Sequence, residues 1–192
     1  MSARKVLVID QFDNGQLLEH SLRQFGYEVA TLKLQTLNLL EVITDLQPDV
    51  AVLNLYSPSG EVLEMILAIN QQQAIPVVMF AEDQQTDTIN KVIQAGVSAY
   101  IVDGLEPSRL KAIVEIAIAR FKQQHALQQE LQKTKTQLED RKAIDRAKAV
   151  LIKSQNYSEE EAYHALRKLA MDRKVSLGEM AKNVIAMAEL LK

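Results

Sequence analysis

The sequence predicts an α/β fold, in which a doubly wound sheet of five parallel strands is followed by a long helix and a small three-helix bundle. Two observations lead to this prediction. The first 120 residues alternate between short apolar runs and stretches with helical spacing. Such alternation is typical of parallel sheets with helices on both faces. The remaining residues show helical patterns only.

Five apolar runs are predicted to be strands, and a stretch with helical spacing follows each. The strand-like runs are residues 5–9, 27–32, 50–55, 76–80 and 99–102. The helical stretches begin near Gly15, Leu37, Gly60, Thr86 and Pro107. Because crossovers between parallel strands are right-handed, five such units favour a flavodoxin-like strand order.

The last of these helices is predicted to continue far beyond the sheet. After Pro107 there is no proline or glycine until beyond Lys153, and good helix formers dominate. Seven-residue steps give Leu110, Ala117, Gln124, Leu131 and Leu138, with partner positions Ile113, Arg120, Leu127, Thr134 and Arg141. This broken heptad pattern indicates a coiled coil, although a single solvated linker helix is the alternative. A helix of this composition is marginal alone, so the pattern favours a homodimer.

Two further helices are predicted at the C-terminal end. Ser158 and Glu161 have the spacing of a capping box, which opens a helix that runs to about Arg173. Ser176 caps the last helix, which starts at Leu177. The expected core of this unit is Ile144, Ala147, Leu151, Ala162, Leu166, Leu169, Ala170 and Ala181. The predicted domains are therefore residues 1–121, a coiled-coil linker 122–140, and residues 141–192.

Charge is distributed unevenly along the chain. Residues 1–121 hold 8 Lys/Arg and 15 Asp/Glu, a net charge of −7, whereas residues 122–192 hold 14 and 10, a net charge of +4. A polyanionic partner would bind the C-terminal part, although a solvated helical surface explains the charge equally well. No stretch approaches the ~20 apolar residues that span a bilayer, so a cytoplasmic protein without membrane contact is expected.

Residues for catalysis or metal binding are not grouped in the sequence. There is no cysteine, and the histidines His20, His125 and His164 lie on separate predicted helices. The glycines are scattered and form no phosphate-binding loop. The sequence therefore predicts neither an enzyme nor a bound cofactor or metal.

Residues at the carboxyl ends of the predicted strands resemble the phosphorylation pocket of receiver domains from two-component response regulators. The resemblance covers about residues 4–121. It places Asp10 and Gln11 at the two acid positions, Asn54 at the phosphoacceptor position, Ala81 at the hydroxyl position and Asp103 at the lysine position. Only one of these five residues matches the receiver pattern, so the pocket is degraded.

These departures argue against phosphoryl transfer. An asparagine is not a phosphoacceptor, and Mg²⁺ favours carboxylate ligands, of which one is missing. An aspartate in place of the lysine would repel the phosphoryl charge. The sequence thus indicates a pseudo-receiver that works without phosphorylation. Asp10 and Asp103 either share a proton or a water, or are solvated at the rim, and the second arrangement is favoured.

Three motifs in the last sixty residues strongly resemble the ANTAR domain, an RNA-binding module of transcription antiterminators. They are Ile144-Asp-Arg-Ala-Lys-Ala-Val-Leu151, Ser158-Glu-Glu-Glu-Ala-Tyr-His-Ala-Leu-Arg-Lys-Leu-Ala-Met171 and Leu177-Gly-Glu-Met-Ala181. The spacing is kept over three helices, across about residues 130–192. The phrase from Ala95 to Leu105 is similar to the NasT-type regulators of nitrate assimilation, which share this architecture with the AmiR type.

Two residues of this module have the chemistry for RNA loops. Tyr163 and Arg167 are four residues apart and so share one helix face. A tyrosine can stack on an unpaired base, and an arginine can bind phosphate or stack. The other expected contacts are Lys148, Lys168, Arg173 and Lys174. The alternative makes Tyr163 a core aromatic and Arg167 a solvated cap.

The resemblance implies an antiterminator. A dimer would bind a leader mRNA that folds into two adjacent hairpins with hexanucleotide loops, and would thereby prevent an overlapping terminator from forming. Nitrate or nitrite would act by releasing the regulator from an inhibitory sensor protein bound to the pseudo-receiver. Two alternatives remain open, namely a phosphorylation-switched response regulator and a protein-interaction scaffold that does not bind RNA.

Overall fold

The computed structural model describes residues 3–12, 15–33, 39–102 and 106–190. Residue contacts divide the chain into two units, Met1–His125 and Ala126–Lys192. Each unit has its own hydrophobic core. Helix α5 (Pro107–Gln155) contributes its first part to the first unit and the rest to the second.

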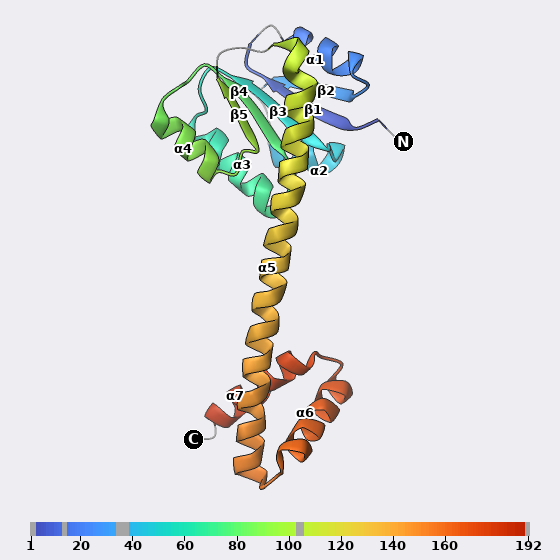
Figure 1. The fold of residues 1–192 in the computed structure, drawn as a ribbon, viewed down its shortest axis with the longest axis vertical. Helices are drawn as coiled ribbons and strands as arrows, with labels where there is room; N and C mark the ends of the chain where they lie inside the picture. Colours follow the sequence, from blue (N-terminus) through green and yellow to red (C-terminus); the bar gives the residue numbers. More distant parts are fainter. Residues whose placement is uncertain (1–2, 13–14, 34–38, 103–105, 191–192) are drawn as a thin grey trace. The chain divides into compact units, whose positions relative to one another are not determined.

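The first unit contains five parallel strands in the order β2-β1-β3-β4-β5 (Figure 1). They are β1 (Lys5–Asp10), β2 (Glu28–Lys33), β3 (Val50–Leu55), β4 (Val77–Ala81) and β5 (Ala99–Val102). The predicted doubly wound sheet is therefore confirmed. The strand order reverses between β1 and β3, and their register pairs Asp10 with Asn54. The carboxyl ends of these strands thus bring the two side chains together.

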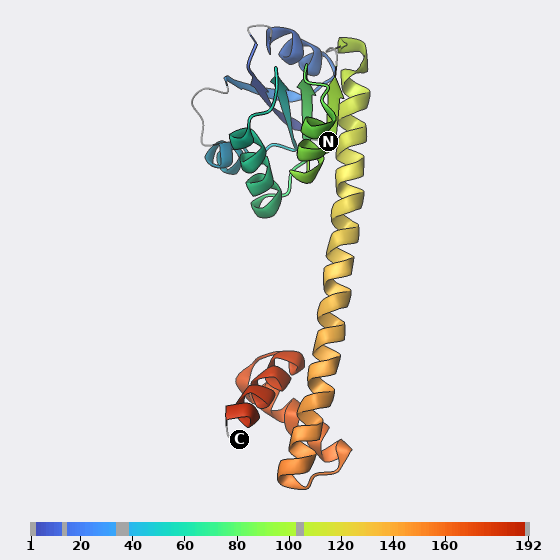
Figure 2. The ribbon, with the colours of Figure 1, turned by 90° about the vertical axis from the view of Figure 1, so that its left-hand side faces the viewer.

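Helices cover both faces of the sheet, as Figures 1 and 2 show. The core on one face includes α1 (Gly15–Gln24) and the start of α5. The core on the other face includes α2 (Leu39–Leu46), α3 (Gly60–Gln72) and α4 (Thr86–Gln94). Every residue of β3 is buried because the strand has helices on both sides. The predicted start of the second helix, at Leu37, lies outside the described residues.

The apolar heptad positions of α5 are buried or partly buried in its first part and exposed in its middle part. Leu110 and Ala117 are fully buried in the core of the first unit, so these positions pack on the sheet and not on a second helix. From Ala126 to Glu139, by contrast, every side chain is exposed. Only this second stretch leaves apolar heptad positions, Leu127, Leu131 and Leu138, for a partner helix.

The second unit packs the end of α5 against α6 (Glu159–Arg173) and α7 (Leu177–Leu190). The predicted capping box is present, with the Ser158 and Glu161 side chains each accepting a hydrogen bond from the other's backbone N–H. Most expected core residues are buried or partly buried. Leu169 is the exception at 39 % exposure, because α6 buries the row Ala162, Leu166 and Ala170, and Leu169 lies at its edge.

Gly178, where α7 begins, lies against a side chain of α5. A Cβ at this position would overlap the carboxyl group of Asp140 on α5, which pairs with Lys182 at 2.8 Å. We expect Gly178→Ala to lower the free energy of unfolding by about 1–3 kcal/mol through overpacking. Adding Asp140→Ala to this variant should recover part of the loss. Chemical denaturation of the two single variants and the double variant would measure the recovery. Additive losses in the double variant would contradict the contact.

Glu115 connects three parts of the first unit. Its carboxylate accepts hydrogen bonds from the Arg4 guanidinium and the Tyr27 hydroxyl, both at 2.6 Å. Both hydrogen bonds lower the pKa of Glu115, and the one from Tyr27 has the larger effect. Burial first, and then the hydrogen bond, raises the pKa of Tyr27 to about 12. These hydrogen bonds therefore connect α5 to the residues that immediately precede β1 and β2.

We expect Glu115→Gln to lower the free energy of unfolding by about 1–2 kcal/mol at pH 7, as for the loss of charge-assisted hydrogen bonds. A carboxylate whose pKa is lower in the folded than in the unfolded protein stabilises the fold at pH values above the unfolded pKa. This stabilisation is lost as the pH falls through the folded pKa. Urea unfolding should therefore show the gap between wild type and variant closing below about pH 4. The exposed pair Glu106–Arg109 provides a control, Glu106→Gln, with little effect. An equal gap at pH 3 and pH 7 would contradict the assignment.

Candidate functional site

Asp10, Gln11 and Asn54 form a hydrogen-bonded cluster at the carboxyl ends of β1 and β3. The Asn54 side-chain amide donates to Asp10 Oδ1 at 2.7 Å, and both residues are buried. The Gln11 N–H donates to the Asn54 carbonyl at 2.9 Å. The Gln11 side-chain oxygen accepts from the Tyr56 N–H at 3.1 Å. Asp10 was expected at a solvated rim, and this prediction is wrong because the strand ends bury it against Asn54.

The Asp10 carboxylate accepts two hydrogen bonds from within the chain, from the Asn54 amide and from the Phe12 N–H. Asn54 supplies a donor where a carboxylate would repel Asp10, and Gln11 supplies an amide where a receiver has its second acid. Ala81 is buried and offers no hydroxyl, and Asp103 lies outside the described residues. Within the described ranges, no group of three His, Asp or Glu side chains is arranged to hold a metal ion. The described side chains provide no phosphoacceptor carboxylate at position 54.

Asp83, in the loop after β4, was not predicted from the sequence. Its carboxylate accepts from the Gln85 N–H at 2.9 Å, the Ser57 hydroxyl at 2.8 Å and the Thr88 hydroxyl at 2.9 Å. The Gln85 N–H, followed by the two hydroxyls, lowers the pKa of Asp83. The Tyr100 hydroxyl donates to the Asp83 carbonyl at 2.7 Å. An aspartate shortly before a predicted helix can form an Asx-turn by accepting from the N–H two residues later, and this signal could have indicated Asp83.

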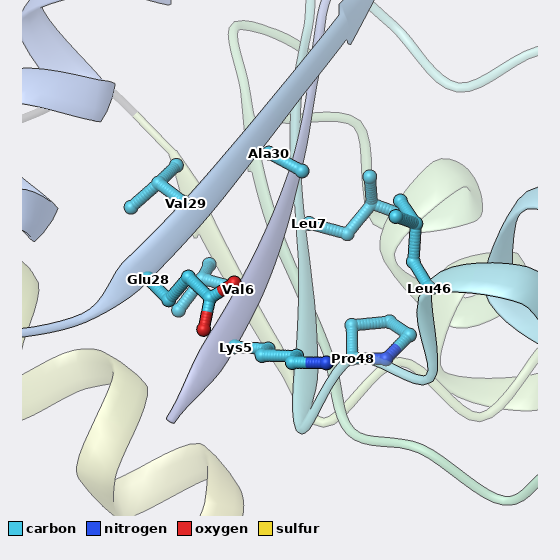
Figure 3. A pocket seen from close by; sticks show the side chains of 8 residues that line it. All are labelled: Lys5, Val6, Leu7, Glu28, Val29, Ala30, Leu46 and Pro48. Carbon is cyan, nitrogen blue, oxygen red and sulfur yellow. The ribbon is translucent and has the colours of Figure 1, made fainter. Parts of the chain in front are cut away.

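Two hollows of the first unit lie at opposite ends of the sheet. At the carboxyl end, Tyr56, Ser57 and residues 82–85 line an open hollow of about 560 Å³. The ring of Phe12 contacts that of Tyr56 beside it, with the ring planes tilted by 50°. At the other end, the first residues of β1 and β2 and the segment before β3 line a cavity of about 90 Å³ (Figure 3). The side chains in Figure 3 are mostly apolar, with Lys5 and Glu28 the charged ones. The open hollow brings the Ser57 hydroxyl together with the Asp83 carboxylate, whereas the cavity in Figure 3 has mainly apolar walls.

The residues of the second unit that are expected to contact RNA differ in exposure and in ion pairing. Tyr163 is 38 % exposed, so it is not a fully buried core aromatic, and Arg167 is exposed one turn further along α6. Lys168, Arg173 and Lys174 are also exposed. Lys174 caps α6 in the left-handed conformation, with φ of 54°.

Lys148 differs from the other cations of this set. Its ammonium group pairs with Asp145 and with Glu159, both at 2.9 Å, and its side chain is only 17 % exposed. The hydrogen bond to Glu159, followed by that to Asp145, raises the pKa of Lys148. The geometry therefore suits a residue that fixes the first turn of α6 against α5 better than one that reaches a phosphate.

Comparison with known families agrees with this two-part organisation. The response regulator receiver domain matches residues 6–115, more than half of the chain, and the ANTAR domain matches residues 132–185. The chain belongs to the ANTAR-domain response regulators. Regulators of this family control transcription and are not enzymes. The described part of this response regulator contains no helix long and apolar enough to cross a membrane.

Two relatives and one solved structure illustrate these similarities. The transcriptional regulatory protein PdtaR of Mycobacterium tuberculosis is 27 % identical over 168 residues, which are 88 % of this chain and 82 % of PdtaR. A nitrate regulatory protein of Klebsiella oxytoca is 42 % identical over 71 residues, 35 % of this chain and 18 % of that protein. The signal receiver domain of a modulated diguanylate cyclase from Desulfovibrio desulfuricans is 18 % identical, with a TM-score of 0.56 over 64 % of this chain and 98 % of that one. This last likeness concerns the fold alone.

Proposed function

We propose that this response regulator is a cytoplasmic, RNA-binding transcription antiterminator that acts as a dimer. The observation that carries the proposal is the match of residues 132–185 to the ANTAR domain. Tyr163 and Arg167 support it, because both are exposed on one face of α6. By binding two adjacent hairpins of a leader mRNA, the protein would favour one of two competing RNA folds and so prevent the terminator from forming.

The exposed stretch of α5 supports a dimer. Leu127, Leu131 and Leu138 are 61 %, 56 % and 54 % exposed, and they occupy core heptad positions. In a parallel pair of helices, these leucines would face their counterparts in the other copy. Each copy would then present one RNA-binding module, which suits an RNA with two hairpins.

The first unit would carry the signal by binding a protein partner. The Asp10–Asn54 hydrogen bond occupies the position at which a receiver accepts a phosphoryl group. The similarity of 71 residues to a nitrate regulatory protein favours nitrate or nitrite as the inducer. We infer that an inhibitory sensor protein binds the first unit and releases the regulator when the inducer is present.

The RNA-binding proposal is tested with a labelled leader RNA that carries two hairpins with hexanucleotide loops. In a gel-shift titration at ~0.15 M salt, where long-range charge effects are screened, the protein should bind this RNA more tightly than one with the same stems and scrambled loops. Equal affinity for the two RNAs would leave only non-specific charge attraction and contradict the proposal. It would favour the scaffold alternative.

The phosphorylation alternative has its own test. Incubation with acetyl phosphate and Mg²⁺ is expected to add no phosphoryl group to the protein, because Asn54 has no carboxylate and donates to Asp10. Intact mass spectrometry detects the modification, and a receiver domain with an intact acid pocket serves as the positive control. A phosphoryl adduct on the wild-type chain would instead support the phosphorylation-switched regulator.

A further inference from the structure

Four cationic side chains lie on one face of α5 in the second unit, namely Lys135, Lys142, Arg146 and Lys153. Successive residues of an α-helix turn by about 100°, so these four positions fall within about 40° of one another and extend over about 27 Å. All four side chains are exposed. They are termed the α5 basic stripe below.

No described acid of the second unit is within ion-pair distance of this stripe. None of the four cations has an ion-pair partner among the residues that the structure describes. Two of the three acids in this part of α5 are already engaged, Asp140 with Lys182 and Asp145 with Lys148. Glu139 is the acid that remains beside the stripe. The stripe is therefore a row of four cations with one unengaged acid on the same part of α5.

A groove of about 390 Å³ between α5 and α7 adjoins the middle of the stripe. Lys142 and Arg146 line it, as do Lys182, Glu139 and Glu189. Because Lys182 is paired with Asp140, the unpaired cations in the groove are Lys142 and Arg146. These two residues are the ones that an anionic chain entering the groove would meet.

We propose that the α5 basic stripe binds the phosphate backbone of RNA, as a contact separate from the α6 face that carries Tyr163 and Arg167. This inference rests on the proposed RNA-binding function and extends it to a second surface. Exposed lysines and arginines in a row can each neutralise a different phosphate. Contacts of this kind increase affinity and salt dependence, but they do not read sequence.

The test compares two double variants of the full-length protein that lose the same charge. Lys142→Gln with Arg146→Gln removes the centre of the stripe, whereas Lys122→Gln with Lys133→Gln removes two exposed cations on the opposite side of α5, about 150° away. Binding of the two-hairpin RNA and of its scrambled-loop counterpart is measured as a function of salt concentration. Circular dichroism verifies that both variants keep their helices.

The stripe variant should bind both RNAs more weakly by the same factor, with its preference for the correct loops unchanged. The slope of log affinity against log salt should decrease in magnitude by about 1.4–1.8, since each phosphate contact contributes about 0.7–0.9. The control variant should keep the wild-type slope. An unchanged slope in the stripe variant, or equal losses in both variants, would overturn this inference while leaving loop-specific binding intact. If the wild type shows no loop preference, the proposed function fails together with the inference.

Discussion

Replacing Leu131 and Leu138 of α5 by aspartate is expected to convert the proposed dimer into a monomer. Both side chains lie on the exposed seam of the helix and make no core of their own. Charges at core heptad positions would have to be buried between the two helices, which is strongly unfavourable. Since the two RNA-binding modules would no longer act together, affinity for the two-hairpin RNA should fall by about 10²–10⁴-fold. Affinity for a single hairpin should change little.

A matched control separates the seam from the added charge. Gln132→Asp with Thr136→Asp adds the same two charges to exposed positions away from the seam. This variant should remain dimeric in analytical ultracentrifugation and keep its affinity for the two-hairpin RNA. A Leu131→Asp, Leu138→Asp protein that still sediments as a dimer would refute the α5 seam. A monomer that binds two hairpins as tightly as wild type would refute the bivalent mode of binding.

Replacing Tyr163 by alanine should weaken binding of the hairpin RNA by about 1–3 kcal/mol, the range for loss of one base stacked on an aromatic ring. The ring is half exposed on α6, so it is available to a base without unfolding the bundle. Tyr163→Phe should keep most of the affinity, because the face of the ring remains. Loss of affinity should be restricted to the RNA with correct loops, since stacking needs the unpaired bases.

Tyr157 provides the control for this substitution. It has the same exposed fraction as Tyr163 but lies in the connection between α5 and α6, outside the α6 face. Filter-binding titrations of Tyr157→Ala should resemble those of wild type, with thermal unfolding used to verify the fold of both variants. If Tyr163→Ala binds the hairpins with undiminished affinity, the α6 face is not the base-contacting surface.

The strands and helices were predictable because their periodicities depend on local sequence. The apolar run Val50–Leu55 and the capping box at Ser158 are complete signals within a few residues, and the structure has a buried strand and a capped helix there. The long helix was also predictable from the absence of proline and glycine. The roles of its residues were not, because Leu110 and Leu131 share one heptad pattern although the first packs on a sheet and the second is exposed.

The surroundings of the site residues depended on partners far away in the sequence. Asp10 is buried because β3 places Asn54 beside it, a pairing over 44 residues that spacing alone does not reveal. Lys148 looked like a phosphate contact by type and position, yet Glu159 on the next helix engages it. Asp83 was overlooked because its role arises from three separate donors, two of them hydroxyls on different elements.

The hydrogen bond between Asn54 and Asp10 opposes the introduction of a carboxylate at position 54. A single mutation of Asn54 to Asp would replace the donor by a second carboxylate at a buried position. Two such groups cannot both ionise without a cation to separate them. This chain has Gln11 where a receiver has its second metal-binding acid, and Asp103 where a receiver has its lysine. The first step back toward a phosphorylatable receiver would therefore be destabilising and would confer no new activity. The hydrogen bond therefore favours asparagine over aspartate at position 54 in this chain.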